Sequence, residues 1–182
     1  MSHPKRPQEG DYNPYYATYV SKVEGDNIYQ ILKKQGKRCR KQLKQLTEEQ
    51  WNYRYAPGKW SIKEVLIHIC DTERIFAYRM LRIARRDATP MPGFDQNDYV
   101  PYYRPETRSI KSLLREHKTI RAATLSLLST LSEEDLAAQA VASDSPVTGL
   151  ALAFIIAGHE RHHMLVLQER YFSAFAETVK SL

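Results

Sequence analysis

The sequence contains little cysteine, no long apolar run and no leader-like N-terminus. Two cysteines among 182 residues cannot form a disulfide framework, which favours a reducing compartment. The longest apolar stretch, from Leu150 to Ala157, is too short to span a bilayer. Residues 1–16 lack the apolar centre of a signal peptide. We therefore expect a cytoplasmic protein with no membrane partner.

Acidic residues are outnumbered, with 21 Asp and Glu against 27 Lys and Arg, which gives a formal net charge of +6. A basic surface suits nucleic acid, an anionic substrate or an acidic partner. The densest basic runs, Lys33 to Lys44 and Arg79 to Arg86, contain no interleaved aromatic residues. We interpret both runs as solvated helix faces, and we do not expect a nucleic-acid partner.

Apolar residues recur at helical spacing in four long segments, and no segment shows a convincing strand pattern. Ser61 and Glu64 form an S-x-x-E capping box at the start of the clearest helix, and Thr47 is expected to cap a short one. The predicted fold class is therefore all-α, with a four-helix bundle as the simplest packing. The expected long helices span residues 27–46, 61–86, 108–131 and 148–172.

The segments outside these helices divide the chain further. Residues 1–24 form an expected irregular arm, Pro-rich and polar at its start, and residues 25–182 are predicted to be a single domain. Residues 142–148 are expected to be a loop. Residues 87–107 form a longer stretch without periodicity, and loops of that length are often functional. We predict that this stretch is a lid with polar contacts from Asp95, Gln96, Asn97, Tyr99 and Tyr102.

Three of the six histidines fall within the stretch GHERHHMLVL. At about 100° per residue, His159 and His163 lie one turn apart on the apolar face of the last helix, with His162 displaced to the flank. His68 lies on the apolar face of helix 61–86. Neutral imidazoles inside a core need partners, and three of them could share Zn²⁺ or Ni²⁺ while leaving positions open for water or substrate. We therefore predict a metal site at His68, His159 and His163.

Two other interpretations of these histidines remain open. Each one could instead be a hydrogen-bonded core residue. The letters from His159 to His163 also match H-E-x-x-H, the zinc-protease helix in which Glu is the general base. A protease of that kind needs a later third ligand, for which Glu177 is the available acid, and its helix normally lies beside a sheet. His3 and His117 lack such a context and are expected to be surface residues.

Three stretches together resemble the DinB/YfiT-like superfamily. They are PGKWSIKEVLIHICDTER (Pro57 to Arg74), PMPGFDQNDYV (Pro90 to Val100) and GHERHHMLVLQERY (Gly158 to Tyr171). The resemblance covers about residues 25–172. It implies a four-helix bundle with up-down-down-up connections.

The resemblance also implies a ligand set and a chemistry. The family's His triad, which binds Ni²⁺, Zn²⁺ or a similar ion, is matched at His68, His159 and His163. Members with known activity are often thiol-dependent transferases or isomerases that use bacillithiol, mycothiol or glutathione. Homodimers are common in the family, so the resemblance implies a homodimer here.

These expectations combine into a metal-dependent enzyme that activates a low-molecular-weight thiol, or water, for attack on an electrophilic small molecule. The alternatives are a hydrolase in which hydroxide is the nucleophile and a non-catalytic metal-binding module linked to stress. Asp71 is a candidate acceptor for an imidazole N–H. Asp71, Asp95 and Arg170 are the candidate catalytic residues, with Asp95 as a polar contact in the lid. Arg170 and Arg74 are candidates for an anionic substrate group, and Cys70 is expected to fill the core.

Overall fold

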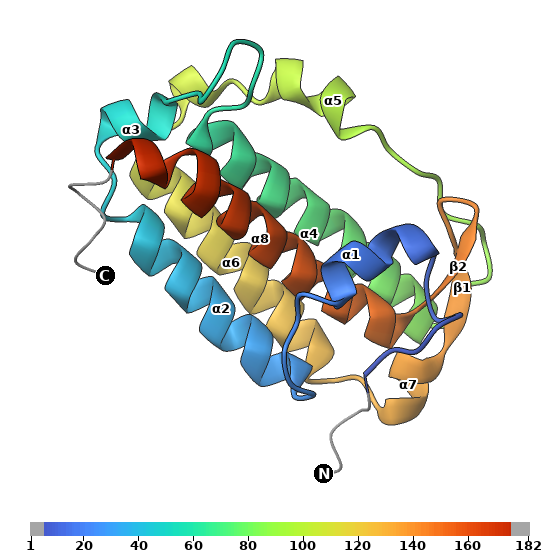
Figure 1. Ribbon diagram of the computed structural model, residues 1–182. Coiled ribbons are helices and arrows are strands. Elements are labelled where there is room, and N and C mark those ends of the chain that lie inside the picture. Colours follow the sequence, from blue (N-terminus) through green and yellow to red (C-terminus); the bar gives the residue numbers. More distant parts are fainter. Residues whose placement is uncertain (1–5, 176–182) are drawn as a thin grey trace.

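The computed structural model describes residues 6–175, and four long helices form its bundle (Figure 1). Helices α2 and α4 each pack against both α6 and α8, so α2 and α4 lie at opposite corners of the bundle. The all-α four-helix bundle predicted from the sequence is thereby confirmed. The long helices are α2 (Ile28–Leu43), α4 (Ile62–Ala84), α6 (Ile110–Leu128) and α8 (Gly149–Arg170).

Side-chain caps explain where several helices begin. Ser61 and Glu64 make the predicted capping box at the start of α4: the Ser61 N–H donates to the Glu64 carboxylate at 2.6 Å, and the Glu64 N–H donates to the Ser61 hydroxyl at 3.3 Å. Thr47 caps α3 (Glu48–Asn52), as predicted, and Ser132 caps α7 (Glu133–Ala137) in the same way. Each box satisfies backbone donors that a helix start leaves without a partner.

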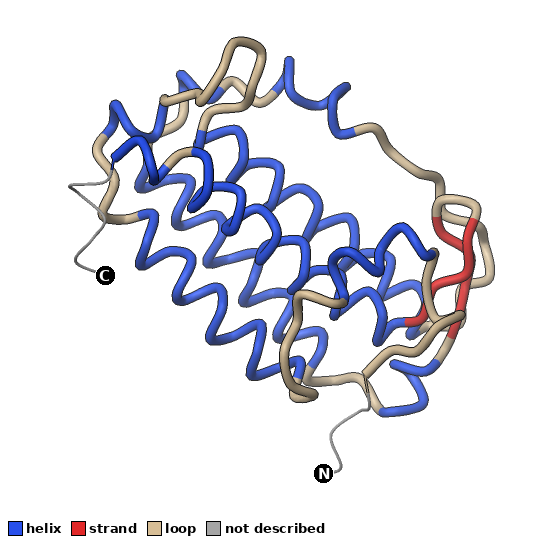
Figure 2. Tube along the Cα trace, viewed as in Figure 1, coloured by secondary structure: helices blue, strands red, loops and turns tan. Residues whose placement is uncertain are grey.

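A small hairpin lies where the sequence predicted a loop, so the prediction for residues 142–148 is wrong (Figure 2). Strands β1 (Gln139–Ala142) and β2 (Ser145–Thr148) pair antiparallel. The turn residues Ser143 and Asp144 both have positive φ, 51° and 59°, as a two-residue type I′ turn requires. The hairpin also binds the long segment before α6, because the Met91 N–H donates to the Val141 carbonyl at 3.0 Å.

The N-terminal segment is not irregular throughout. It contains a 3-10 turn at Pro14–Tyr16 and helix α1 (Ala17–Val20), which packs against α8 (Figure 1). Gly158 makes this contact possible, because a Cβ at that position would lie only 2.1 Å from the Tyr19 carbonyl oxygen. Helix α1 therefore covers the middle of α8.

Residues 87–107 connect α4 to α6 and pass back along the length of the bundle (Figures 1 and 2). They contain α5 (Gln96–Tyr99) and 3-10 turns at Val100–Tyr102 and Pro105–Thr107. Arg79 holds the start of this segment, since it donates to the Pro92 carbonyl at 2.7 Å and to the Ser143 hydroxyl at 3.0 Å. Arg79 is buried, so the interpretation of its basic run as a wholly solvated face is wrong at this residue.

The core consists of two apolar clusters, one at each end of the bundle. Ala151 to Ala157 of α8 belong to the first cluster, and Met164 and Leu167 belong to the second. In helix α4 the second cluster ends at Cys70 and the first begins at Phe76, and the buried polar residues His68, Thr72 and Glu73 lie near this boundary. A buried polar layer therefore crosses the middle of the bundle. Within residues 6–175, no helix combines the length and hydrophobicity needed to cross a bilayer.

Candidate metal centre

The buried polar layer has two parts, which lie on two different faces of α8. His159 and Glu160 are consecutive, so the helix directs their side chains about 100° apart. His159 faces α4, where it meets His68, whereas Glu160 meets Arg121 of α6. The predicted metal site belongs to the first part only.

Three imidazoles from two helices converge in this first part. Nε2 of His159 lies 2.9 Å from Nε2 of His68 and 3.1 Å from Nε2 of His163. Together the three residues can offer one nitrogen each, all within 4.8 Å of one another. The ring of Trp60 packs on His68, and the ring of Tyr19 packs on His159. The structure therefore brings together the three histidines that the sequence analysis selected.

Burial keeps these imidazoles neutral. Desolvation, together with repulsion from His162, lowers the pKa of His68 to about 4. Desolvation and the neighbouring histidines also lower the pKa of His159 and of His163 well below the ordinary value. A neutral imidazole is the form that binds a metal ion.

The arrangement fits a shared divalent cation. Three Nε2 atoms face one another without an acidic side chain among them, and a single proton between two nitrogens cannot satisfy all three. An ion with metal–nitrogen distances of about 2.0–2.1 Å holds adjacent ligand nitrogens about 3 Å apart. The observed spacings of 2.9 and 3.1 Å match that requirement. Three protein ligands also leave coordination positions open.

Two cavities adjoin the three histidines. One, of about 270 Å³, is lined by His159 and by residues of α1, α4 and the connecting segment. The other, of about 320 Å³, is lined by His163 and by residues around Lys59 and Trp60. Gln96 lines the first cavity and Asn97 lines the second. Small molecules can therefore approach the histidines from two sides, with α5 over both.

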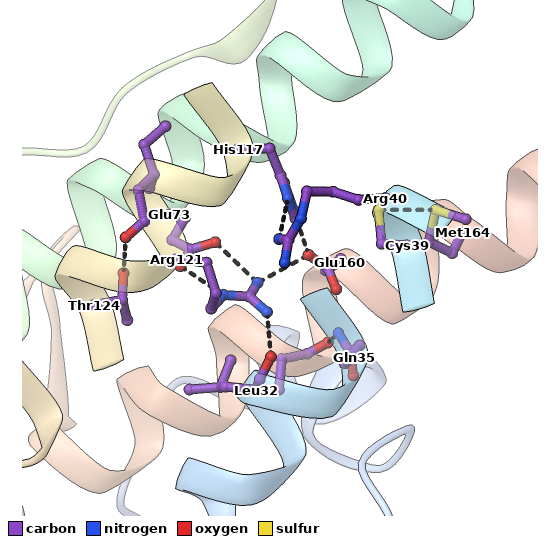
Figure 3. A network of polar contacts seen from close by, with 12 residues as sticks. Leu32, Gln35, Cys39, Arg40, Glu73, His117, Arg121, Thr124, Glu160 and Met164 are labelled. Carbon is purple, nitrogen blue, oxygen red and sulfur yellow. Dashed lines mark hydrogen bonds and ion pairs between the residues drawn. The ribbon is translucent and has the colours of Figure 1, made fainter. Parts of the chain in front are cut away.

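Glu160 lies in the second part of the polar layer, which Figure 3 shows. Its Oε2 accepts hydrogen bonds from Arg121 at 2.8 Å and from His117 at 2.7 Å. Arg121 also binds both carboxylate oxygens of Glu73, at 2.8 and 2.9 Å. A carboxylate held in this way is unavailable as a base beside His159, which removes the structural basis of the H-E-x-x-H interpretation. Glu177, the third ligand considered for that interpretation, lies outside the described residues, as does His3.

His117 is fully buried in this network, so the prediction that it is a surface residue is wrong. Its Nδ1 lies 3.1 Å from Nη1 of Arg40, which can only donate. The ring proton therefore sits on Nε2 and is donated to Glu160 (Figure 3). A sequence signal was present, because His117, Arg121 and Thr124 interrupt the apolar stripe of α6 at helical spacing.

Cys39, His117 and Glu160 form a second group close enough to share an ion, but their surroundings do not fit one. Arg40 and Arg121 bring two guanidinium groups to the same place. Burial, followed by the charge of Glu160, raises the pKa of Cys39 well above its usual value, so the sulfur stays protonated. A cation at this place would be repelled by both guanidinium groups.

The remaining candidates lie at the edge of the site or outside it. Asp71 accepts a hydrogen bond from Arg74 at 2.9 Å. Its partner is therefore a guanidinium and not the expected imidazole. Asp95 caps α5 by accepting from the Asn97 N–H at 2.8 Å. Arg170 packs over Tyr55, which lines the cavity beside His163. Cys70 is buried among apolar residues, as expected.

The sequence model of the DinB superfamily matches residues 31–167. The chain belongs to the DinB superfamily. Among relatives of this DinB-superfamily protein is one from Oceanobacillus iheyensis named "Putative metal-dependent hydrolase OB0413". It is 26% identical over 149 residues, which cover 79% of this chain and 84% of the relative.

Two solved structures of Bacillus subtilis share the fold. YfiT, described as "a probable metal-dependent hydrolase with an unusual four-helix bundle topology", superposes with a TM-score of 0.74 over 93% of each chain at 14% identity. The DinB-like protein YjoA superposes with a TM-score of 0.60, covering 82% of this chain and 92% of its own, at 20% identity. At these identities, the similarity to the two structures shows a shared fold and nothing about function.

Proposed function

We propose that this DinB-superfamily protein is a metal-dependent enzyme in which His68, His159 and His163 hold one divalent cation. The observation that carries the proposal is the convergence of three neutral Nε2 atoms from two helices, with spacings of 2.9 and 3.1 Å. Ni²⁺ and Zn²⁺ both suit a set of imidazole ligands with open positions. When bound, such an ion supplies a Lewis acid that lowers the pKa of a small thiol or of water.

The chain's own residues support a reaction between two small molecules. The cavity beside His163 contains Lys59, and Arg170 lies over its Tyr55 wall, so this side suits a polar or anionic co-substrate such as a low-molecular-weight thiol. The cavity beside His159 is separate and suits an electrophile. The protein would thus hold the two reactants on either side of the three histidines. This arrangement favours thiol transfer.

Hydrolysis is the second candidate, and the names of the relatives favour it, because the Oceanobacillus iheyensis protein is named a "putative metal-dependent hydrolase" and YfiT is described as "a probable metal-dependent hydrolase". Water then replaces the thiol as nucleophile and one cavity suffices for the organic substrate. A non-catalytic metal-binding module is less consistent with two cavities at the ligands.

Metal analysis tests the proposal directly. Protein purified without a metal-affinity tag should contain close to one Ni²⁺ or Zn²⁺ per chain, and His159→Ala should lose it. His162→Ala is the matched control, because His162 is adjacent on α8 but does not belong to the converging group. A metal content that is unchanged in His159→Ala would refute the proposed ligand set.

Thiol dependence then separates the two reactions. The metal-loaded protein is incubated with a panel of electrophiles and with esters, each with and without bacillithiol, mycothiol or glutathione. Thiol transfer predicts product only when a thiol is added. Cleavage of esters at the same rate without thiol would establish hydrolysis and reject the transferase assignment.

A further inference from the structure

The cavity beside His159 is an aromatic chamber built from three separate parts of the chain. Helix α1 and the preceding turn supply Tyr15, Tyr16 and Tyr19, and α4 supplies Phe76. Phe94 of the connecting segment forms a further wall. The ring of Tyr16 meets that of Phe76 edge to face, with centroids 6.0 Å apart. Such walls favour a flat ring, which can stack or pack edge to face against them.

One polar group inside this chamber has no partner. Thr72 lines the cavity and is only 3% exposed, and its hydroxyl makes no hydrogen bond within the described residues. Two other helical threonines satisfy theirs locally: Thr119 donates to the Arg115 carbonyl at 3.0 Å, and Thr124 donates to the Ile120 carbonyl at 3.1 Å. An unpaired buried hydroxyl is costly, so the Thr72 hydroxyl is suited to a partner that arrives from outside the chain.

The charge of the lining narrows the class of ligand further. Its side chains are aromatic, hydroxyl or amide groups, together with the imidazole of His159. The guanidinium of Arg79 approaches Phe76 and Phe94 but is engaged by the Pro92 carbonyl and the Ser143 hydroxyl. A cationic ligand would find no acidic side chain in this lining, and its desolvation would oppose binding, whereas an anion would bind the proposed cation instead of the lining.

We propose that this chamber binds an uncharged, single-ring aromatic compound whose polar substituent hydrogen-bonds to the Thr72 hydroxyl. The inference rests on the proposed function, in which this compound is the electrophilic substrate beside His159. To the proposed function it adds a class of substrate, a single-ring aromatic compound, and it makes Thr72 a specificity-determining residue. The cavity volume of about 270 Å³ limits the size of the ligand to roughly one substituted ring.

Binding of simple probes tests this assignment without any assay of activity. Benzamide carries a ring and an uncharged polar group, cyclohexanecarboxamide lacks the aromatic ring, and benzylammonium carries a positive charge. Dissociation constants are measured by NMR titration on the metal-loaded full-length protein. Benzamide should bind more tightly than either of the other two. Equal binding of all three, or no binding of benzamide, would overturn the proposal.

Substitutions at Thr72 then locate the probe. Thr72→Val should weaken benzamide binding roughly threefold to tenfold, the usual range for one hydrogen bond, whereas Thr72→Ser should retain it. Thr124→Val is the matched control, because it removes a buried hydroxyl that already has a partner outside the cavity. If Thr72→Val does not fold, Tyr16→Leu removes one wall instead and should weaken benzamide binding. Unchanged affinity in a folded Thr72→Val or Tyr16→Leu protein would overturn the proposal.

Metal content, measured on the same samples, separates this inference from the proposed function. Wild-type protein that binds metal but not benzamide would refute the aromatic chamber and leave the metal centre intact. Wild-type protein that binds benzamide in a Thr72-dependent way but contains no metal would refute the metal centre and retain the chamber.

Discussion

His159 and Glu160 are neighbours in the chain, yet they join two different polar clusters. Nε2 of His159 lies 2.9 Å from Nε2 of His68, and Oε2 of Glu160 lies 2.8 Å from Nη2 of Arg121. Glu160 thus ties α8 to α6, whereas His159 and His163 face α4. The carboxylate stabilises the bundle without contacting the three histidines.

Glu160→Ala should destabilise the protein by about 3–5 kcal/mol, because it leaves Arg121 and Glu73 as a buried group with an excess donor. Metal content at saturating Zn²⁺ should fall only in proportion to the unfolded fraction. Urea unfolding and metal analysis at neutral pH measure the two effects. Glu169→Gln, an exposed acid on the same helix, is the control and should change stability by less than about 0.5 kcal/mol.

Glu160 should also give the stability a dependence on acid pH. Burial alone raises the pKa of this carboxyl, but Arg121 and His117 outweigh burial and hold the pKa at about 2. An unfolded glutamate titrates at about 4.3, so the folded-state pKa is the lower one. The contribution of the carboxylate is therefore complete above about pH 4.3 and is lost as the pH falls towards about 2.

Urea unfolding of wild type and Glu160→Gln at about pH 5, 4 and 3 checks this dependence. The wild-type free energy of unfolding should fall more steeply with acid than that of the variant. Parallel curves for the two proteins would show that Glu160 does not titrate as described.

Gly158→Ala should displace α1 from α8. The added Cβ would lie 2.1 Å from the Tyr19 carbonyl oxygen, which is backbone and cannot rotate away. Overpacking of this kind costs about 1–3 kcal/mol. Limited proteolysis should then cleave the N-terminal segment sooner than in wild type. Gly93→Ala is the control, since its Cβ would meet Ser143 at an ordinary 3.4 Å and should leave the proteolysis pattern unchanged.

Removal of the metal should lower thermal stability. An ion that binds only the folded state, present at about 100 times its dissociation constant, stabilises it by about 2.7 kcal/mol. Dialysis against a chelator should therefore lower Tm, and added Zn²⁺ or Ni²⁺ should restore it. In His68→Ala the added ion should have little effect on Tm. A full Zn²⁺-dependent rise in that variant would indicate that the stabilising ion binds elsewhere.

The features that the sequence predicted correctly depend on local spacing. The capping box at Ser61 and Glu64 lies within one turn, and the common face of His159 and His163 follows from their separation by four residues. Helical periodicity likewise gave the four long helices. Each of these relationships is set by backbone geometry before any tertiary contact forms.

The features that the sequence did not predict either have a weak local signal or depend on distant partners. The strands β1 and β2 have only four residues each, and their turn, Ser143-Asp144, lacks the usual Asn-Gly or Asp-Gly signal. The burial of His117 depends on Arg40 and Glu160, which belong to other helices. The homodimer, the cytoplasmic location and the identity of the metal stay predictions.

Gln96 and Asn97 are consecutive, yet each borders a different chamber beside the histidines. Under the proposed two-reactant function, a substitution that moves this short helix would alter both chambers together. Variants selected for a bulkier electrophile through changes at Gln96 would then also change how the second reactant enters. To engineer one specificity independently would require substitutions in the chamber walls away from α5.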